Sequence, residues 1–260
     1  LAASFAGFAT LTFGLGLWYL QSLGYENGVY VALMLAALMW LFAALSYSRI
    51  QEYKGATEGA ENGFLHALSK LKLLYQDKPF AHFIITRALL LCSALSAPFY
   101  IVLASEQAFD FSLLATFMAL SGLASLVSAP IWGRLSDLSS RKVLVFAAML
   151  VTLNGFAVYL VAYLSPQTLN EFWLLPLCYF LLTVAHQGVR LGRKTYLVDM
   201  AEGNKRTDYV SVSNTVIGVI LLLLGSVGLL NTYLTTAELI FFYSILGLLG
   251  SISSWFLPDA

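Results

Sequence analysis

The sequence predicts an all-α membrane protein, a polytopic transmembrane helix bundle with eight spans. Of its 260 residues, 59% are hydrophobic and only 11% are charged, and its mean hydropathy is +0.79. A soluble domain carries about 25% charged residues, so this chain has too few to cover a surface exposed to water. Eight apolar runs are long enough to cross a bilayer, and the basic residues gather in alternate connectors between them. This composition excludes an ordinary soluble enzyme, a disordered chain and a nucleic-acid-binding protein.

The predicted spans follow from the lengths of the apolar runs. A helix needs about 20 apolar residues to cross the roughly 30 Å hydrocarbon core of a membrane. The runs of this kind that lack Asp, Glu and Lys are Leu1–Leu20, Val29–Ser48, Phe80–Ala104, Phe111–Trp132, Val143–Leu164, Phe172–Val189, Val210–Leu230 and Leu239–Leu257. Each is too long for a barrel strand, and none alternates polar with apolar residues, so all are predicted to be helices.

The connectors between these runs alternate strictly in charge. Four short connectors contain no Lys or Arg, namely Gln21–Gly28, Ser105–Asp110, Ser165–Glu171 and Asn231–Glu238. The other three, Arg49–Pro79, Gly133–Lys142 and Arg190–Tyr209, hold thirteen of the fourteen basic residues. Because basic connectors stay on the cytoplasmic side of a membrane, we expect these three connectors and both termini to be cytoplasmic.

The connector Arg49–Pro79 changes in character along its length. Gly55–Gly63 consists mostly of Gly, Ala, Thr and Glu, which predicts a flexible linker. Phe64–Asp77 is amphipathic, because its apolar residues recur at helical spacing. Two interpretations of this second part remain open. It is either an interfacial helix on the cytoplasmic leaflet or a helix packed on the protein itself.

The clearest functional motif lies between the fourth and fifth spans, in the segment Gly133–Lys142. Gly133 is expected to let the chain turn sharply at the end of a helix. Asp137 follows four residues later, and the cations Arg141 and Lys142 come after it. A carboxylate beside two cations can form charge-assisted hydrogen bonds that hold neighbouring helix ends together. Such bonds exist only while the ends are close, so the segment is predicted to act as a gate.

This segment resembles the signature loop of the major facilitator superfamily, G-x-L-[SA]-D-[RK]-x-G-[RK]-[RK]. Leu138 and Ser140 depart from that pattern, and the matching residues are Gly133, Leu135, Ser136, Asp137, Arg141 and Lys142. The alternative is a generic basic loop that contains one Asp. The connector after the sixth span is also similar to the family's link between its tenth and eleventh helices. That similarity implies that Arg190 or Arg193 reaches Asp137 when the cytoplasmic side is closed; the alternative is a basic loop that only sets topology.

The resemblance also implies how the chain is divided. It corresponds to the last eight of twelve helices, and a chain that starts on Leu1 without an initiator Met is expected to be a fragment. Residues 1–50 are then the last two helices of the N-terminal half-bundle. Residues 51–79 are the central cytoplasmic loop with its amphipathic helix, and residues 80–260 are the C-terminal six-helix bundle.

Polar residues at helical spacing predict a substrate path. On the sixth span, Tyr179, Thr183, His186, Gln187 and Arg190 share one helix face, and on the third span Thr86, Ser93, Ser96 and Tyr100 form a similar stripe. A polar face inside a membrane must contact protein or a water-filled cavity. In the superfamily these two spans line the cavity. The residues expected to face the substrate are Tyr100, Tyr179, Thr183, His186 and Gln187. The alternative for all of them is hydrogen bonding between helices.

Single charged and titratable residues within the spans have their own alternatives. The unperturbed pKa of a histidine is about 6.5, so His186 either carries a proton or serves as a structural hydrogen-bonding residue. Arg87 is expected to extend to the lipid headgroups rather than to bind substrate. Asn154 and Asn214 are expected to join helices by hydrogen bonds. No carboxylate falls in mid-membrane, so the residues present name no acidic proton site.

Small residues on the fourth span predict a close helix contact. They recur near one face, at Ala115, Ala119, Gly122 and Ser125. Small faces let two helices approach closely. Either a sliding contact or ordinary bundle packing requires such a face.

By resemblance, the chain is a secondary transporter that works by alternating access, with the segment Gly133–Lys142 as its cytoplasmic gate. Its expected partners are a small-molecule substrate, with a coupling proton or ion left open, and membrane lipids. No nucleic acid, metal or cofactor is expected, and the expected state is a monomer in a bacterial inner membrane. The alternatives are a receptor-like or structural membrane protein and an intramembrane enzyme. The enzyme is disfavoured because the chain has no HExxH or GxSxG motif.

Overall fold

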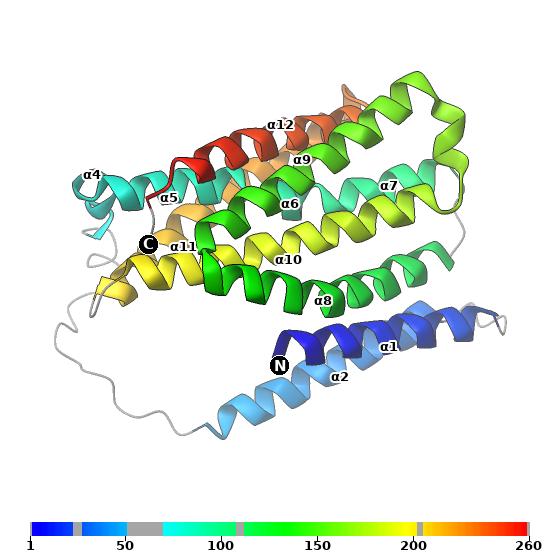
Figure 1. Ribbon diagram of the computed structural model, residues 1–260. Coiled ribbons are helices and arrows are strands. Elements are labelled where there is room, and N and C mark those ends of the chain that lie inside the picture. The colour runs from blue at the N-terminus through cyan, green and yellow to red at the C-terminus, as the bar shows by residue number, and fades with distance from the viewer. Residues whose placement is uncertain (1, 23–27, 51–69, 108–111, 202–204, 259–260) are drawn as a thin grey trace.

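A computed structural model of the chain describes residues 2–22, 28–50, 70–107, 112–201 and 205–258. Every regular element in these ranges is a helix, which confirms the predicted all-α class (Figure 1). The helices are α1 (Ala2–Ser22), α2 (Gly28–Ser48), α4 (Leu73–Gln76), α5 (Lys78–Leu89), α6 (Cys92–Leu95), α7 (Ala97–Gln107), α8 (Ser112–Leu138), α9 (Ser140–Leu164), α10 (Leu174–Met200), α11 (Lys205–Gly225) and α12 (Thr236–Trp255). Two 3₁₀ helices, η1 (Pro166–Asn170) and η2 (Ser226–Thr232), lie between longer elements.

Six helical stretches within the described ranges are long and apolar enough to cross a membrane. They are Lys78–Gln107, Ala115–Leu138, Ser140–Leu164, Leu174–Met200, Arg206–Thr232 and Thr236–Trp255. The two N-terminal helices contain apolar stretches that are shorter within the described residues, Ala6–Leu20 and Leu33–Ser48. The prediction of a polytopic helix bundle is therefore confirmed.

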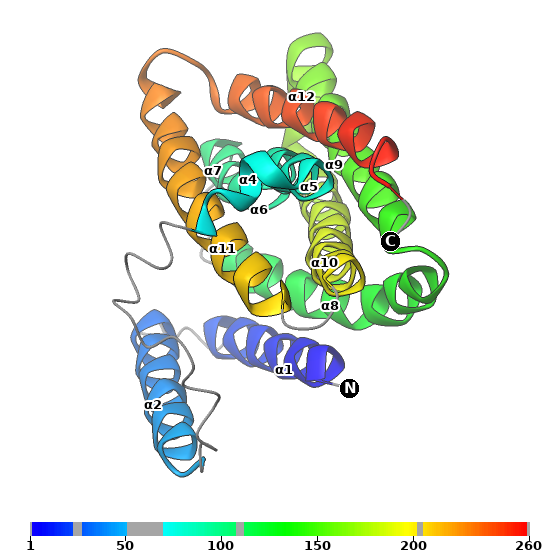
Figure 2. The same ribbon diagram turned by 90° about the vertical axis from the view of Figure 1, so that its left-hand side faces the viewer.

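The helices run nearly side by side in one bundle (Figures 1 and 2). In the view along the bundle, α5, α6 and α7 lie between α9, α11 and α12, and α10 lies next to α8 (Figure 2). Helix α1 runs along α8, and α2 lies beyond α1 (Figures 1 and 2). The start of α5, the end of α10 and the C-terminus lie at the same end of the molecule (Figure 1). We call it the basic end, because Lys78, Lys142, Lys194 and Arg206 lie near the helix termini there.

The first span of this bundle is interrupted. Its helix stops at Leu89, resumes as the short α6 and restarts as α7. The second break follows from Pro98, which has no backbone N–H to donate to Ala94 and which disfavours helical geometry at the preceding residue. The breaks also change which way the polar residues of this span face. Thr86 bonds Ser253 of α12 (2.7 Å), whereas Ser93 bonds His186 of α10 (3.1 Å), so the predicted single stripe does not exist.

The turn between α8 and α9 corrects the expectation for Gly133. This residue lies inside α8, which continues to Leu138, and an alanine Cβ at Gly133 would meet no atom within 4 Å. The chain turns instead at Ser139, whose extended backbone (φ −170°, ψ 113°) caps α9 and whose side chain accepts from Lys142 N at 3.3 Å. A serine hydroxyl satisfies an amide of the first helical turn, so no glycine is needed there.

Helix α10 also continues past its apolar run. The sequence predicts that the sixth span ends at Val189, but the helix continues to Met200 and includes Arg190 and Arg193. Hydropathy marks the length of a membrane crossing and does not mark the end of a helix, because the backbone bonds of a helix form equally well outside the lipid. Most of the predicted basic connector is thus helical.

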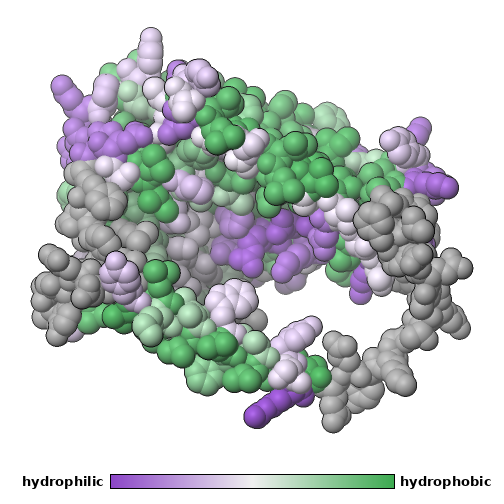
Figure 3. Space-filling view, turned by 180° about the vertical axis from the view of Figure 1, so that it is seen from behind, coloured by the Kyte–Doolittle hydropathy of each residue, from purple (hydrophilic) through white to green (hydrophobic). Residues whose placement is uncertain are grey.

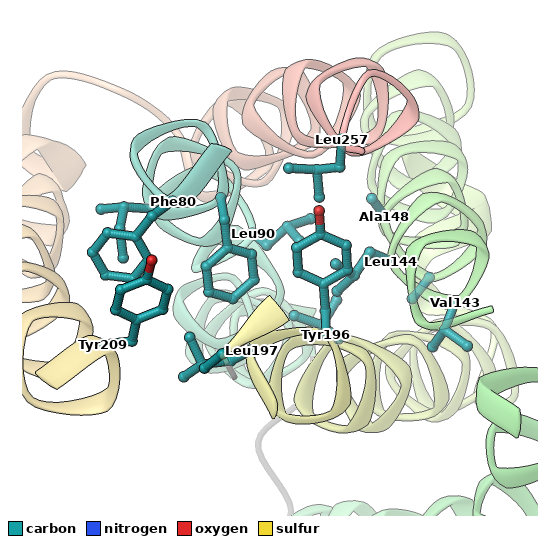
Figure 4. Packing of buried hydrophobic residues seen from close by; sticks show 14 of the residues in the cluster. Phe80, Leu90, Val143, Leu144, Ala148, Tyr196, Leu197, Tyr209 and Leu257 are labelled. Carbon is teal, nitrogen blue, oxygen red and sulfur yellow. The ribbon is translucent and has the colours of Figure 1, made fainter. Parts of the chain in front are cut away.

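Buried aromatic and aliphatic side chains form a core near the basic end (Figure 4). Phe80 of α5 stacks on Tyr209 of α11 with ring centroids 4.4 Å apart, and Phe83 stacks on Tyr196 of α10 at 5.2 Å. Leu257, which follows α12, is buried beside Tyr196 (Figure 4). A second core toward the other end includes Tyr100, Phe117 and Tyr243.

The described part of the long connector packs on the protein. Residues 51–69, which include the predicted linker Gly55–Gly63 and the start of the predicted amphipathic helix, lie outside the described residues. Beyond them, Leu71, Leu73 and Leu74 pack against the core at the basic end. Lys70 forms an ion pair with Asp208 of α11 at 2.6 Å. The described part of this stretch therefore packs on the protein, and its position relative to the lipid stays a prediction.

Small residues bring α1 and α8 into close contact, as the face of small residues on α8 predicts. Gly7 and Gly14 of α1 lie against α8, where a Cβ at Gly7 would be 3.0 Å from the backbone N of Leu126. A Cβ at Gly122 of α8 would overlap the backbone of Leu11. The two helix backbones therefore approach each other without intervening side chains.

Candidate functional site

The polar face of α10 lies partly buried in the bundle. Tyr179, Thr183, His186 and Gln187 are half-buried, and Arg190 is exposed. They face neighbouring helices in different directions. Tyr179 packs edge-on against Phe117 of α8, with ring centroids 4.5 Å apart. The Thr183 hydroxyl donates to the backbone oxygen of Tyr179 at 2.9 Å, which satisfies it within its own helix.

Gln187 joins α10 to α8. Its Nε2 donates to the hydroxyl of Ser125 at 2.9 Å, and that hydroxyl donates to Ser121 O at 3.0 Å. Two further contacts hold the helices close here. Trp132 of α8 donates from Nε1 to Val184 O at 2.8 Å, and its ring lies over Gly188, where a Cβ would come within 2.7 Å.

His186 contacts the interrupted span. Its Nδ1 lies 3.1 Å from the hydroxyl of Ser93, which lies in the short helix α6. Ser93 also lies 3.0 Å from the backbone oxygen of Leu90, toward which its hydroxyl donates. A hydroxyl has one hydrogen, so with this donation in place His186 Nδ1 is the donor to Ser93. The imidazole is thereby oriented by the break in the helix, and Nε2 is left as an acceptor.

Tyr100 lies in the packed interior instead of on an open surface. It is 1% exposed, and its hydroxyl accepts from Asn154 Nδ2 at 3.0 Å. Asn154 of α9 also donates to the backbone oxygen of Cys178 in α10 at 2.9 Å. Asn154 therefore joins three helices, as expected, and Tyr100 takes part in the helix–helix bonding that was its alternative role.

Arg87 does not extend to the lipid headgroups, which corrects the expectation for this residue. Its guanidinium is directed toward α11, where Nη1 donates to the buried Ser213 and Nη2 donates to Asn214 Oδ1 at 3.0 Å. Its Nε is buried, with no hydrogen-bond partner among the described residues. The reason is that α11 places two polar acceptors within hydrogen-bond reach of the guanidinium. An arginine inside an apolar run is the sequence signal that could have identified this site, although the sequence alone assigned Arg87 to the headgroups.

Other cations lie near Arg87. Arg193 of α10 interacts electrostatically with Arg87, and both Arg190 and Arg193 interact with His186. Since His186, Arg190 and Arg193 are spaced i, i+4 and i+7, they share one face of α10. In the part of the chain that the structure describes, no carboxylate forms an ion pair with any of these arginines.

A hollow lies between the bundle and the N-terminal helices, beside the contact of α1 with α8 (Figure 3). Hydrophilic residues gather on its wall, near the middle of the long axis of the molecule (Figure 3). Helix α11 lies on this side of the bundle (Figure 2), and its Asn214 is exposed. Polar surface at mid-length is unusual in a chain whose other exposed helix faces are apolar, such as that of α2 with Trp40 77% exposed.

At the basic end, the predicted gate residues have different surroundings. Asp137 and Lys142 are exposed, and among the described residues Asp137 forms no ion pair, so the structure does not bring it together with Arg190 or Arg193. Arg141 donates to the backbone oxygen of Leu257 at 3.0 Å.

Two contacts that the sequence did not indicate link α8 and α9 to α10 at this end. Ser136 donates to Thr195 Oγ1 at 3.1 Å, and Ser140 donates to Asp199 Oδ2 at 2.8 Å. The carboxylate engaged at this junction is therefore Asp199. Its partner lies 59 positions away in the chain, so no local pattern could have identified it.

At the opposite end, a recess of about 350 Å³ opens between α7, α8 and α10, lined in part by Gln107, Leu113 and Glu171. In the described residues, no three His, Cys, Asp or Glu side chains gather in a group that could hold a metal ion.

Comparison with known proteins adds one finding. A family model described as Major Facilitator Superfamily matches residues 1–219 and, in a second alignment, residues 88–260. The two matches overlap and together span the chain. No curated protein and no solved structure shows significant similarity to it.

Proposed function

Because the chain belongs to the major facilitator superfamily, a family of membrane transporters, we propose that it is a secondary active transporter that moves a small solute by alternating access. The chain is an integral, multi-pass membrane protein. The observation that carries the proposal is the polar face of α10, which lies half-buried at mid-length in a bundle whose cores are formed by apolar and aromatic side chains. Polar and ionisable residues at this depth mark a solute pathway in membrane proteins.

The binding region that we propose lies where α10 meets the interrupted span. Discontinuous helices are a recurrent feature of transporter binding sites, because their free backbone groups can contact a ligand. Here the break holds Ser93 against His186. Tyr179, Thr183 and Gln187 flank this contact along the same helix and complete the proposed substrate path. Tyr100 supports this path indirectly, because its hydroxyl accepts from Asn154, the residue of α9 that also donates to α10.

The moving parts that we propose are residues 1–50 and residues 80–260, joined by the central loop of residues 51–79. The contact between α1 and α8 supports this division, because it is built from small residues such as Gly14 and Gly122. Such a surface lacks interlocking side chains, so two bodies can change their angle across it at low cost.

The gate that we propose is the junction of α8 and α9 at the basic end. Asp137 is exposed there, next to Arg141 and Lys142, and is accessible to a cation from a neighbouring helix. Arg190 and Arg193 are the candidate partners on α10. An ion pair that forms in one conformation and is absent in another shifts the balance between the two.

Cysteine labelling tests both the orientation and the mechanism. For orientation, Lys142→Cys and Glu171→Cys each place a thiol on an exposed residue at opposite ends of the bundle. We expect an impermeant maleimide to label Lys142→Cys only from the cytoplasmic side and Glu171→Cys only from the outside. Labelling of both from one side would contradict the proposed orientation and the spans.

For mechanism, Gln187→Cys places a thiol in the middle of the substrate path, in a background where the buried Cys92 and Cys178 are replaced by alanine. An alternating-access transporter exposes this position to each side in turn, so the reagent is expected to react from either side. Leu153→Cys is the control. It lies on the apolar outer face of α9, 58% exposed and outside the proposed path, so it should stay unlabelled. Labelling of Gln187→Cys from one side alone would favour a receptor-like protein instead.

A further inference from the structure

We propose that Arg87, Arg190 and Arg193 form the substrate site and that the solute is a small oxyanion, a carboxylate or a phosphate. This inference rests on the proposed transport function and adds the class of substrate to it. It depends on three features of the structure: a set of cations that pair with no carboxylate among the described residues, a guanidinium donor with no partner among them, and a hollow with a hydrophilic wall.

The first feature is the excess of positive charge. Arg193 of α10 lies close enough to Arg87 of α5 to repel it. Arg190 and Arg193 repel each other in the same way. Within the described ranges no Asp or Glu forms an ion pair with them. Positive charges held together in a medium of low dielectric are costly unless an anion accompanies them.

The second feature is the geometry of Arg87. A guanidinium presents five N–H donors in a plane and matches the two oxygens of a carboxylate or phosphate. Ser213 and Asn214 orient this plane by accepting from Nη1 and Nη2. The buried Nε has no partner among the residues that the structure describes. Arg87 lies about 14 Å along the helix from Lys78, at roughly 1.5 Å per residue, so its Nε is expected to be well inside the membrane.

The third feature is access. Asn214 and Arg190 are exposed, although both belong to helices that cross the membrane. The hollow between the bundle and the N-terminal helices has a hydrophilic wall at mid-length (Figure 3). A cleft lined by one sign of charge concentrates ions of the opposite sign. Because the exposed Asn214 accepts from Arg87 Nη2, an anion that reaches this amide is one side chain away from the guanidinium.

Paired ligands that differ in charge test this inference on the purified full chain. Benzoate, succinate and inorganic phosphate are compared with the neutral benzamide, succinamide and glucose. Binding is followed by the shift in melting temperature, and uptake is followed in proteoliposomes. We expect at least one of the anions to stabilise the protein and to be transported, and its neutral counterpart to do neither.

Substitution of the arginine then assigns the site. Arg87→Gln is expected to weaken binding of the anion about tenfold or more, since hydrogen bonds to charged groups are the strong ones. Arg87→Lys should be intermediate, because it keeps the charge and loses the planar donors. Arg206→Gln, at an exposed residue outside the cluster, is the matched control and should bind as the wild type does. Arg193→Gln provides a second test if Arg87→Gln does not fold.

Three outcomes would overturn the inference in distinguishable ways. Transport of a neutral compound that Arg87→Gln leaves unchanged would leave the transport function intact and remove the anion site. Stabilisation by phosphatidylglycerol vesicles, with no response to the soluble anions, would assign the cluster to a lipid headgroup. Failure of all six compounds to bind or to cross the membrane would count against the anion site and the proposed function together.

Discussion

Replacement of Gly122 by alanine is expected to push α1 away from α8. At this position an added Cβ would overlap the backbone N and Cα of Leu11 and would lie 2.9 Å from the backbone oxygen of Gly7. Nonbonded heavy atoms attract one another at about 3.5–4.0 Å, so these contacts are repulsive. The atoms in question belong to a helix backbone and cannot rotate aside as a side chain would. Helix α1 must therefore move as a unit.

The size of the effect follows from a matched control. Gly16→Ala adds the same methyl group to α1 at a position where nothing lies within 4 Å. Both substitutions gain the same helix propensity, about 1 kcal/mol for alanine over glycine, so this gain cancels in the comparison. What remains is the cost of overpacking, typically about 1–3 kcal/mol. At roughly 2–4 °C for each kcal/mol, Gly122→Ala should melt on the order of 2–12 °C below Gly16→Ala.

The assay is thermal unfolding of both purified variants in the same detergent, followed by tryptophan fluorescence. Crosslinking between cysteines placed on α1 and α8 gives an independent measure of their separation. We expect the crosslinking yield to fall in Gly122→Ala and to stay at the wild-type level in Gly16→Ala. Equal melting temperatures and equal yields would refute the close approach of the two helices.

Three further predictions concern single contacts. Asp137→Asn is expected to slow transport in proteoliposomes with expression largely intact, and a wild-type rate would remove this residue from the gate. Asn154→Leu leaves the buried hydroxyl of Tyr100 without its donor, which should lower the free energy of thermal unfolding by about 1–3 kcal/mol. Adding Tyr100→Phe should recover part of that loss, and no recovery would contradict the hydrogen bond. Asp208→Asn removes the ion pair with Lys70. Because the side chains of Asp208 and Lys70 are 31% and 34% exposed, the free energy of unfolding should fall by about 1 kcal/mol or less, and a large loss would contradict this prediction.

The sequence predicted the fold class and the spans because both depend on local properties. The free energy of moving a segment from water to lipid is the sum of contributions from its own residues, so the run Val143–Leu164 identifies the helix Ser140–Leu164 without knowledge of its neighbours. The motif around Asp137 is local as well, and it was sufficient to indicate the family. The small residues of α8 predicted a close contact and left its partner, α1, unnamed.

Two expectations about single residues were wrong. Gly133 follows the end of an apolar run, which predicts a turn there, but the helix continues and the turn is at Ser139, whose side chain caps the next helix. Arg87 was assigned to the headgroups because an isolated helix offers it no other polar group. In the bundle, Ser213 and Asn214 of α11 accept its hydrogen bonds.

Composition and the order of residues alone thus determined that this chain crosses a membrane repeatedly as helices, since the free energy of transfer into lipid depends on the residues of each segment separately. Only the tertiary structure decided where the polar residues of those helices point. Arg87 and Ser213 are 126 positions apart, and His186 and Ser93 are 93 positions apart. Partners at such separations are chosen by how the helices pack, and packing depends on the shapes of all the side chains between them.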